Sequence, residues 1–334
     1  HNPLNSQTKC DNIKSTDIDK YLIKIFDSAT EKDKIYDFFF EIRPTKIKEN
    51  VINNKDIYIG EVVEMFKKVF VIDKNKVSMS KEFPKVRLHY IDIRDYANNA
   101  YGGMFQLNDY IYRVIRSGYI NTQDIDHIKG LLGNDLYYVD YISNLLYPNK
   151  PIKLDKPKST IPSTRYTVKE MDDIIDNLID KIKNKYKNEN NKKIINQIIN
   201  NELKNTIDEY YGYVKEFSDL LDKLKGKLST SMTDLDISEK YIGYGIAGAQ
   251  IEYMFYELSL CNQRVESAEL QIFSLLTDLF FVRRFVDKEY ITNGIAYTGI
   301  AHSTNYIYIL CKYFGFDITH YVYLKESPKK VIDI

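Results

Sequence analysis

Residues 291–316 constrain the fold of this chain more than any other segment. An apolar run at 295–297 is followed by Gly299, by His302 and by an amphipathic stretch that begins near Ser303. This order predicts a buried strand, a tight turn and a capped helix that ends near residue 314. It places His302 at the carboxyl end of the strand, where open α/β sheets tend to hold their ligands.

Two more runs in the first third of the chain predict strands. Residues 35–42 are almost entirely apolar or aromatic and stop before Pro44, and residues 86–95 alternate in polarity after Pro84. Helical periodicity accounts for most of the remaining chain, in the ranges 61–71, 105–117, 123–147, 167–182, 194–228 and 237–286. We therefore predict a helix-rich α/β fold, with a mixed or parallel sheet built from both halves of the chain.

A cluster of four prolines between Pro148 and Pro162 interrupts this pattern. Proline continues neither a helix nor a central strand, so the cluster predicts a linker or a crossover. The predicted domain organisation is an N-terminal α/β half, a proline-rich linker, a helical-hairpin insertion and a C-terminal α/β half that completes the sheet, over residues 1–147, 148–164, 165–228 and 229–334. The apolar stripe of the hairpin suits packing against the core, or a coil that binds a partner or a second copy.

Charge and composition disfavour several classes of protein. Lys and Arg together number 47, as do Asp and Glu, so the formal net charge is zero and nothing attracts the chain globally to nucleic acid or to anionic membranes. No apolar run approaches the roughly 20 residues that would span a bilayer. The three cysteines are too widely spaced for a disulfide framework or a zinc pattern. We expect a location inside a cell, and a natural start upstream of His1 because the chain lacks an initial methionine.

If the three predicted strands are parallel neighbours, their carboxyl ends bring an imidazole together with several acids. Such a group suits a general base with its orienting carboxylate, or a divalent metal site. The candidate catalytic residues are His302, Asp92, Asp95 and Glu41, and the candidate substrate contacts are Arg94, Arg284 and Ser303. The helix that follows the strand should favour the neutral imidazole. The alternative is structural: the acids and Arg94 pair to close the strand end, and His302 bonds a backbone group in the turn.

Other motifs give less support to chemistry. His89 lies three residues from Asp92 in a predicted strand, so the two face opposite sides, and we predict a core or interface histidine. Residues 243–248 match the glycine spacing of a dinucleotide fingerprint, but no strand precedes them, so close helix packing is favoured. The sequence contains no nucleophile elbow, Walker loop or zinc-protease motif.

Two segments, 86–95 and 291–306, resemble stretches of uncharacterised proteins of nucleocytoplasmic large DNA viruses. The abundance of Ile, Lys, Asn and Tyr fits such AT-rich genomes. More distantly, the strand followed by Gly299 and His302 is similar to the Gly-x-x-His turn of the TraB/ChaN/erythromycin-esterase-like clan, which implies an α/β fold and metal-assisted or histidine-based hydrolysis at His302. The acidic–histidine motif of that clan has no counterpart here, because Gly60 and Glu61 are followed by two valines.

Two functions follow from these observations. The first is a non-catalytic viral protein that acts through protein–protein contacts in the infected cell or the virion, with self-association through residues 165–228 as one form, and without a cofactor. Tyrosine, of which the chain has 29, suits such interfaces because it buries a large area at modest entropic cost. The alternative is a hydrolase-like enzyme with a His/Asp site at the strand ends, for which a divalent metal is the candidate cofactor.

Overall fold

The structure of the chain is a computed structural model that describes residues 18–31, 34–42, 57–71, 78–93, 100–155, 168–231 and 245–320. These residues form two compact units. The first, called the sheet unit, comprises His1–Asp95, Tyr186–Ile194 and Thr277–Ile334, and the second, called the helical unit, comprises Tyr96–Lys185 and Ile195–Leu276. Both units are assembled from segments that alternate along the chain. The four-part division expected from the sequence is a different one and stays a prediction.

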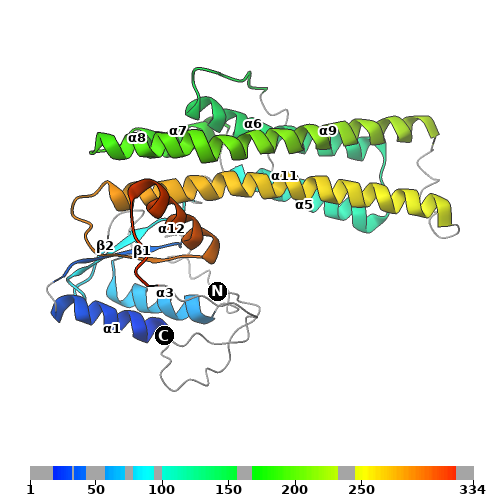
Figure 1. The fold of residues 1–334 in the computed structure, drawn as a ribbon. Helices are drawn as coiled ribbons and strands as arrows, with labels where there is room; N and C mark the ends of the chain where they lie inside the picture. The colour runs from blue at the N-terminus through cyan, green and yellow to red at the C-terminus, as the bar shows by residue number, and fades with distance from the viewer. Residues whose placement is uncertain are drawn as a thin grey trace. The chain divides into compact units, whose positions relative to one another are not determined.

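The sheet unit is built around four strands (Figure 1). They are β1 (Tyr36–Phe40), β2 (Ser78–Met79), β3 (Val86–Tyr90) and β4 (Gly294–Tyr297), in the spatial order β2-β3-β1-β4. β3 and β4 both pair with β1 in parallel, and β2 pairs with β3 in antiparallel. The sheet is therefore mixed and contains strands from both ends of the chain. This confirms the predicted α/β class.

Alternation along β1 sends its aromatic side chains to both faces of the sheet. Phe38 and Phe40 face α1 (Ile18–Glu31) and α3 (Ile57–Val69), which lie together under one face in Figure 1. There the ring of Phe26 in α1 meets that of Phe38 edge-on at 5.5 Å between centroids. Phe39 points to the other face and packs edge-on against Phe281, 5.2 Å away.

The second face of the sheet is covered by the end of α11 (Gly245–Val286) and by α12 (Ile300–Phe314). The ring of Tyr306 in α12 stacks on that of Phe281 in α11 at 4.0 Å. Gly299 is the N-cap of α12, and the helix ends at Gly315, whose φ of 71° is the left-handed conformation that glycine adopts without strain. The helix thus begins three residues earlier than the predicted start near Ser303, so His302 lies within its first turn.

The helical unit contains the long helices, several of which run alongside one another (Figure 1). Its elements are α5 (Ala100–Ser117), α6 (Thr122–Leu146), α7 (Val168–Lys183), the end of α8 (Glu189–Ile198), a π-helical turn η2 (Ile199–Leu203), α9 (Lys204–Ser231) and the first part of α11. Phenol–carboxylate bonds join α6 to α7: Tyr141 donates to Asp176 at 2.8 Å, and Tyr137 donates to Asp172 at 3.1 Å.

The apolar stripe of the predicted hairpin is buried inside the helical unit. In α7, Met171, Ile175 and Leu178 are all no more than 2% exposed, and Phe217 and Leu221 in α9 are fully buried. Within residues 168–228 the structure describes no large hydrophobic side chain as exposed. Self-association through this segment therefore stays a prediction. None of the helices among the described residues has the length and apolar character required to cross a bilayer.

Candidate functional site

His302 lies between two carboxylates that come from other elements of the sheet unit. Its Nδ1 is 2.6 Å from Oδ1 of Asp278, a fully buried residue of α11. Its Nε2 is 3.3 Å from Oε1 of Glu41, which directly follows β1. The backbone N–H of Gly299 donates to the other oxygen of Glu41 at 3.0 Å. One imidazole thus connects the end of β1, the β4–α12 turn and α11.

Neighbouring polar groups hold this arrangement in place. Asn305, one turn along α12 from His302, donates its amide to Oδ2 of Asp278 at 2.8 Å. Both oxygens of that buried carboxyl therefore have a partner, as buried carboxylates require. The hydroxyls of Thr298 and Ser303 bond each other at 2.8 Å across the turn. Two side chains of the turn thus bond each other across it.

The charges around His302 favour its protonated form. Burial by itself would lower the pKa of His302, but the hydrogen bond with Asp278 and the charge of Glu41 outweigh it, so this pKa is raised above its ordinary value. Asp92, a buried residue, adds a smaller contribution of the same sign. Burial raises the pKa of Asp278, while its bonds with His302 and Asn305 act against that shift. The surrounding carboxylates thus shift the pKa of His302 in the direction opposite to the one expected from the helix terminus.

A second histidine–carboxylate group lies in the middle of the sheet. Asp37 of β1 is fully buried and accepts from Arg87 Nε at 2.8 Å and from Arg87 Nη2 at 2.6 Å. Nε2 of His89 lies 2.6 Å from the same carboxylate, and the His89 ring stacks on Phe39 at 4.5 Å. Arg87 and His89 both belong to β3 and point to one face, two residues apart. The prediction that His89 is a core residue is confirmed.

His89 has the opposite charge preference to His302. Burial lowers the pKa of His89, the bond with Asp37 opposes this, and the charge of Arg284 lowers it further. Arg284 lies with Nη2 3.4 Å from Nδ1 of His89 and also donates to the carbonyl oxygen of Tyr90. Because a guanidinium only donates, Nδ1 is the acceptor and Nε2 carries the hydrogen that bonds Asp37. His89 is thus a neutral, fixed part of the core.

The structure brings together part of the predicted site. Glu41, Asp92 and His302 are neighbours at the carboxyl ends of β1, β3 and β4. Arg284 contacts the strand ends through Tyr90, and Ser303 bonds within the turn. Two of the predicted residues, Arg94 and Asp95, lie outside the described residues.

Sequence reasoning missed the closest partner of His302. Asp278 is absent from the predicted site, whereas it bonds the imidazole directly. The available signal was its position: it is a carboxylate among the buried residues Leu276, Leu279 and Phe280 of α11. A charge within an apolar stripe requires a partner. Asp37, within the aromatic run of β1, carried the same signal.

The arrangement is closer to an ion-paired junction than to a base poised for a substrate. A general base needs a free lone pair within reach of the proton that it removes, and Nε2 of His302 faces Glu41. Within the described ranges, no group of three or more His, Cys, Asp or Glu side chains is arranged to hold a metal ion. The catalytic roles and the divalent metal stay predictions.

Comparison with known proteins supports the viral resemblance. The chain is 35% identical over 354 residues to R706, an uncharacterised protein of Acanthamoeba polyphaga mimivirus. The alignment covers 99% of this chain and 82% of R706. Two further uncharacterised proteins of the same virus, R161 and R160, are each 30% identical, over 96% and 99% of this chain and 81% and 83% of their own lengths. No solved structure matches this chain. The similarity to the TraB/ChaN/erythromycin-esterase-like turn stays a prediction.

These relatives share the full span of both units rather than one motif. A family of unknown function (DUF5847) matches residues 1–333, which include every strand of the sheet and the acids around His302. The chain therefore belongs to this family of unknown function, DUF5847.

Proposed function

We propose that this chain is a non-catalytic viral protein that acts through protein–protein contacts, and that α12 provides a contact surface. The observation that carries the proposal is that α12 is apolar on both of its faces. Tyr306 and Ile309 are buried against the rest of the sheet unit, whereas Ile300 is 71% exposed and Ile307 is 49% exposed. Large apolar side chains that gather on the exposed side of a helix often mark a contact surface. The outer face of α12 therefore suits a partner.

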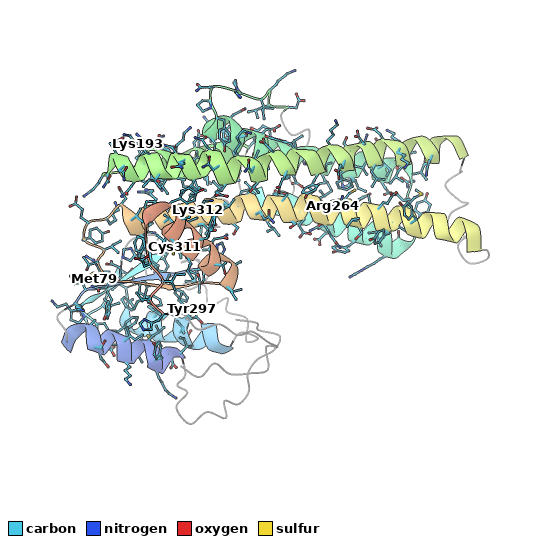
Figure 2. The ribbon with its side chains drawn as sticks, viewed as in Figure 1. Met79, Lys193, Arg264, Tyr297, Cys311 and Lys312 are labelled. Carbon is cyan, nitrogen blue, oxygen red and sulfur yellow. The ribbon has the colours of Figure 1, made fainter. Side chains whose placement is uncertain are left out.

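The exposed apolar side chains continue beyond the helix. The α12 surface, as we call it, consists of Ile300, Ile307, Tyr308, Phe316 and Ile318, all of them exposed. Figure 2 shows the side chains along α12, with Cys311 and Lys312 labelled near its end. Five large exposed hydrophobic residues within 19 positions are a concentration of the kind that marks interaction sites, since single exposed residues are common and need no explanation.

A hollow in the sheet unit shares Phe316 with this surface. Its volume is about 400 Å³, and its lining includes Phe285, Ile291, Phe314 and Phe316, with Lys288 among its polar residues. Tight protein interfaces are anchored by aromatic or apolar side chains that fill such hollows. We therefore take the partner to be a protein that inserts an apolar side chain here and covers the outer face of α12.

The test replaces Ile307 or Ile300 by aspartate and asks whether a partner is lost. The tagged chain is crosslinked in infected cells and purified with whatever is bound to it. Wild type should retain a defined viral or host protein that both variants lose. The surface variant Lys34→Asp, as the control, should retain that protein. Sedimentation of the purified chain distinguishes a second copy from another protein. Equal recovery of every crosslinked protein by wild type and Ile307→Asp, with folding verified by circular dichroism, would contradict the proposal.

The second candidate, a hydrolase-like site, is favoured by one observation. His302 is hydrogen-bonded through Nδ1 to a buried carboxylate, which is how a base is oriented in acyl-transfer enzymes. To act, its Nε2 would have to part from Glu41 and lose the proton that the surrounding acids stabilise. Turnover of ester or phosphate substrates abolished by His302→Ala, or a stoichiometric divalent ion lost in that variant, would support this candidate over the first.

A further inference from the structure

Two carboxylic acids of the helical unit are buried without a hydrogen-bond donor among the described residues. Asp135 of α6 is fully buried, and Glu269 of α11 is 1% exposed. In the part of the chain that the structure describes, none of their four carboxyl oxygens has a hydrogen-bond partner. The two groups are neighbours, because the charge of Asp135 acts on Glu269. Buried carboxylates without donors are rare in folded proteins and require an explanation.

The surroundings supply no positive charge. Burial dominates at both carboxyls, and the charges that act on Glu269 are those of Asp135 and Glu266, both acidic. No lysine or arginine among the described residues acts on either group. An ionised pair here would lack both water and a counter-charge, so it neutralises instead.

The other titratable groups around the pair add negative charge or none. Tyr210 of α9 is fully buried, its hydroxyl oxygen has no partner among the described residues, and the charges of Glu269 and Asp135 both act on it. Asp140 of α6 also acts on Tyr210. Tyr138 of α6 is influenced by Asp135 and, from α7, by Asp172. The groups that share an electrostatic influence with the pair are therefore phenols and acids.

We propose that Asp135 and Glu269 form a proton-binding site, in which the folded helical unit holds at least one proton on the two carboxyls. A protonated carboxyl accounts for two buried acids that lack both a donor and a counter-charge. A bound metal ion fits less well, because Ca²⁺ and Mg²⁺ require roughly six or more oxygen ligands and this pair with Tyr210 offers few.

The site makes the stability of the helical unit dependent on pH. The pKa of each carboxyl is raised well above its ordinary value by burial, whereas the unfolded chain ionises normally near pH 4. At pH values between the unfolded pKa and the raised folded pKa, the folded state binds more protons than the unfolded state, so the free energy of unfolding falls as pH rises. For each proton retained, the unfolding equilibrium constant rises about tenfold per pH unit.

The experiment compares Asp135→Asn and Glu269→Gln with wild type by urea unfolding of the full chain from pH 5.5 to 8.5. Hydrogen exchange of peptides from α6 and α11 assigns the transition to the helical unit. In wild type, the unfolding equilibrium constant should rise with pH, and in each variant this rise should be weaker by up to about tenfold per pH unit. At the alkaline end of the range, each variant should be more stable than wild type. The control Asp219→Asn, at an exposed position of α9, should keep the wild-type slope.

Three results would overturn the proposal. One is an equal pH slope in wild type and both variants. Another is a stoichiometric metal ion whose removal by a chelator unfolds the helical unit. If either variant fails to fold, infrared spectroscopy of the wild-type protein decides instead: a protonated-carboxyl band that persists at neutral pH supports the proton site, and a spectrum without such a band refutes it.

Discussion

Replacement of His302 by alanine tests the charged junction that connects β1, α11 and α12. The change leaves the fully buried carboxylate of Asp278 without the imidazole that lies 2.6 Å away. Removing one partner of a buried ion pair costs about 3–5 kcal/mol, and because the His302 side chain is 18% exposed we expect the lower end, about 3 kcal/mol. The matched control is His320→Ala, at an exposed histidine of the same unit, which should cost less than about 0.5 kcal/mol.

The pH dependence of that loss has a defined sign. The pKa of His302 is raised in the folded state, so its charge contributes fully below the unfolded value of about 6.5, and this contribution is lost as pH rises through the folded pKa. The cost of His302→Ala should therefore be larger at pH 6 than at pH 9. Urea unfolding, with hydrogen exchange of α12 peptides as a local measure, provides both values. A cost equal to that of His320→Ala, or one that grows with pH, would refute the ion-paired assignment.

Three further changes test other parts of the fold. Asp37→Ala removes the acceptor that Arg87 and His89 share and should destabilise the sheet unit by about 3 kcal/mol in urea unfolding, because the partly buried guanidinium of Arg87 loses its counter-charge; a loss below about 1 kcal/mol would contradict this. Gly315→Ala forces alanine to a φ of 71° and should cost about 1 kcal/mol in thermal unfolding, whereas no loss would argue against the left-handed cap. Burial, with the nearby Asp172, raises the pKa of Tyr137 to about 12, so a spectrophotometric titration should lose one late-ionising phenol in Tyr137→Phe and keep it if the assignment is wrong.

Local patterns predicted β1, β3 and β4 because each of these strands carries its own signal, whereas β2 (Ser78–Met79) was not predicted. The run 36–40 is aromatic, 86–90 alternates and 294–297 ends in a glycine turn, and these became β1, β3 and β4. The predicted site required these three strands to be parallel neighbours, and β3 and β4 do pair with β1 in parallel. The convergence of Glu41 with His302 followed from that topology alone, since the ends of parallel strands meet at one edge.

The remaining features depend on contacts that no local pattern contains. Asp278 and Asp135 look like ordinary acids on amphipathic helices, and only packing shows that one meets His302 and the other meets Glu269. The direction of the pKa shift of His302 depends on distant acids in the same way, and it is opposite to the direction expected from the helix terminus. Burial of a charge is a tertiary property, and its effect on titration becomes visible only once the neighbours are placed.

The pairing of β4 with β1 has a consequence for biosynthesis. β1 and β3 leave the ribosome well before β4, which follows roughly 200 residues after β3, with the helical unit in between. At about 5–20 residues per second, one edge of the nascent sheet waits on the order of 10–40 s for its last strand. During that interval the bare edge of β1 is open to wrong pairing, so we expect chaperones to engage the unfinished chain until its final segment emerges.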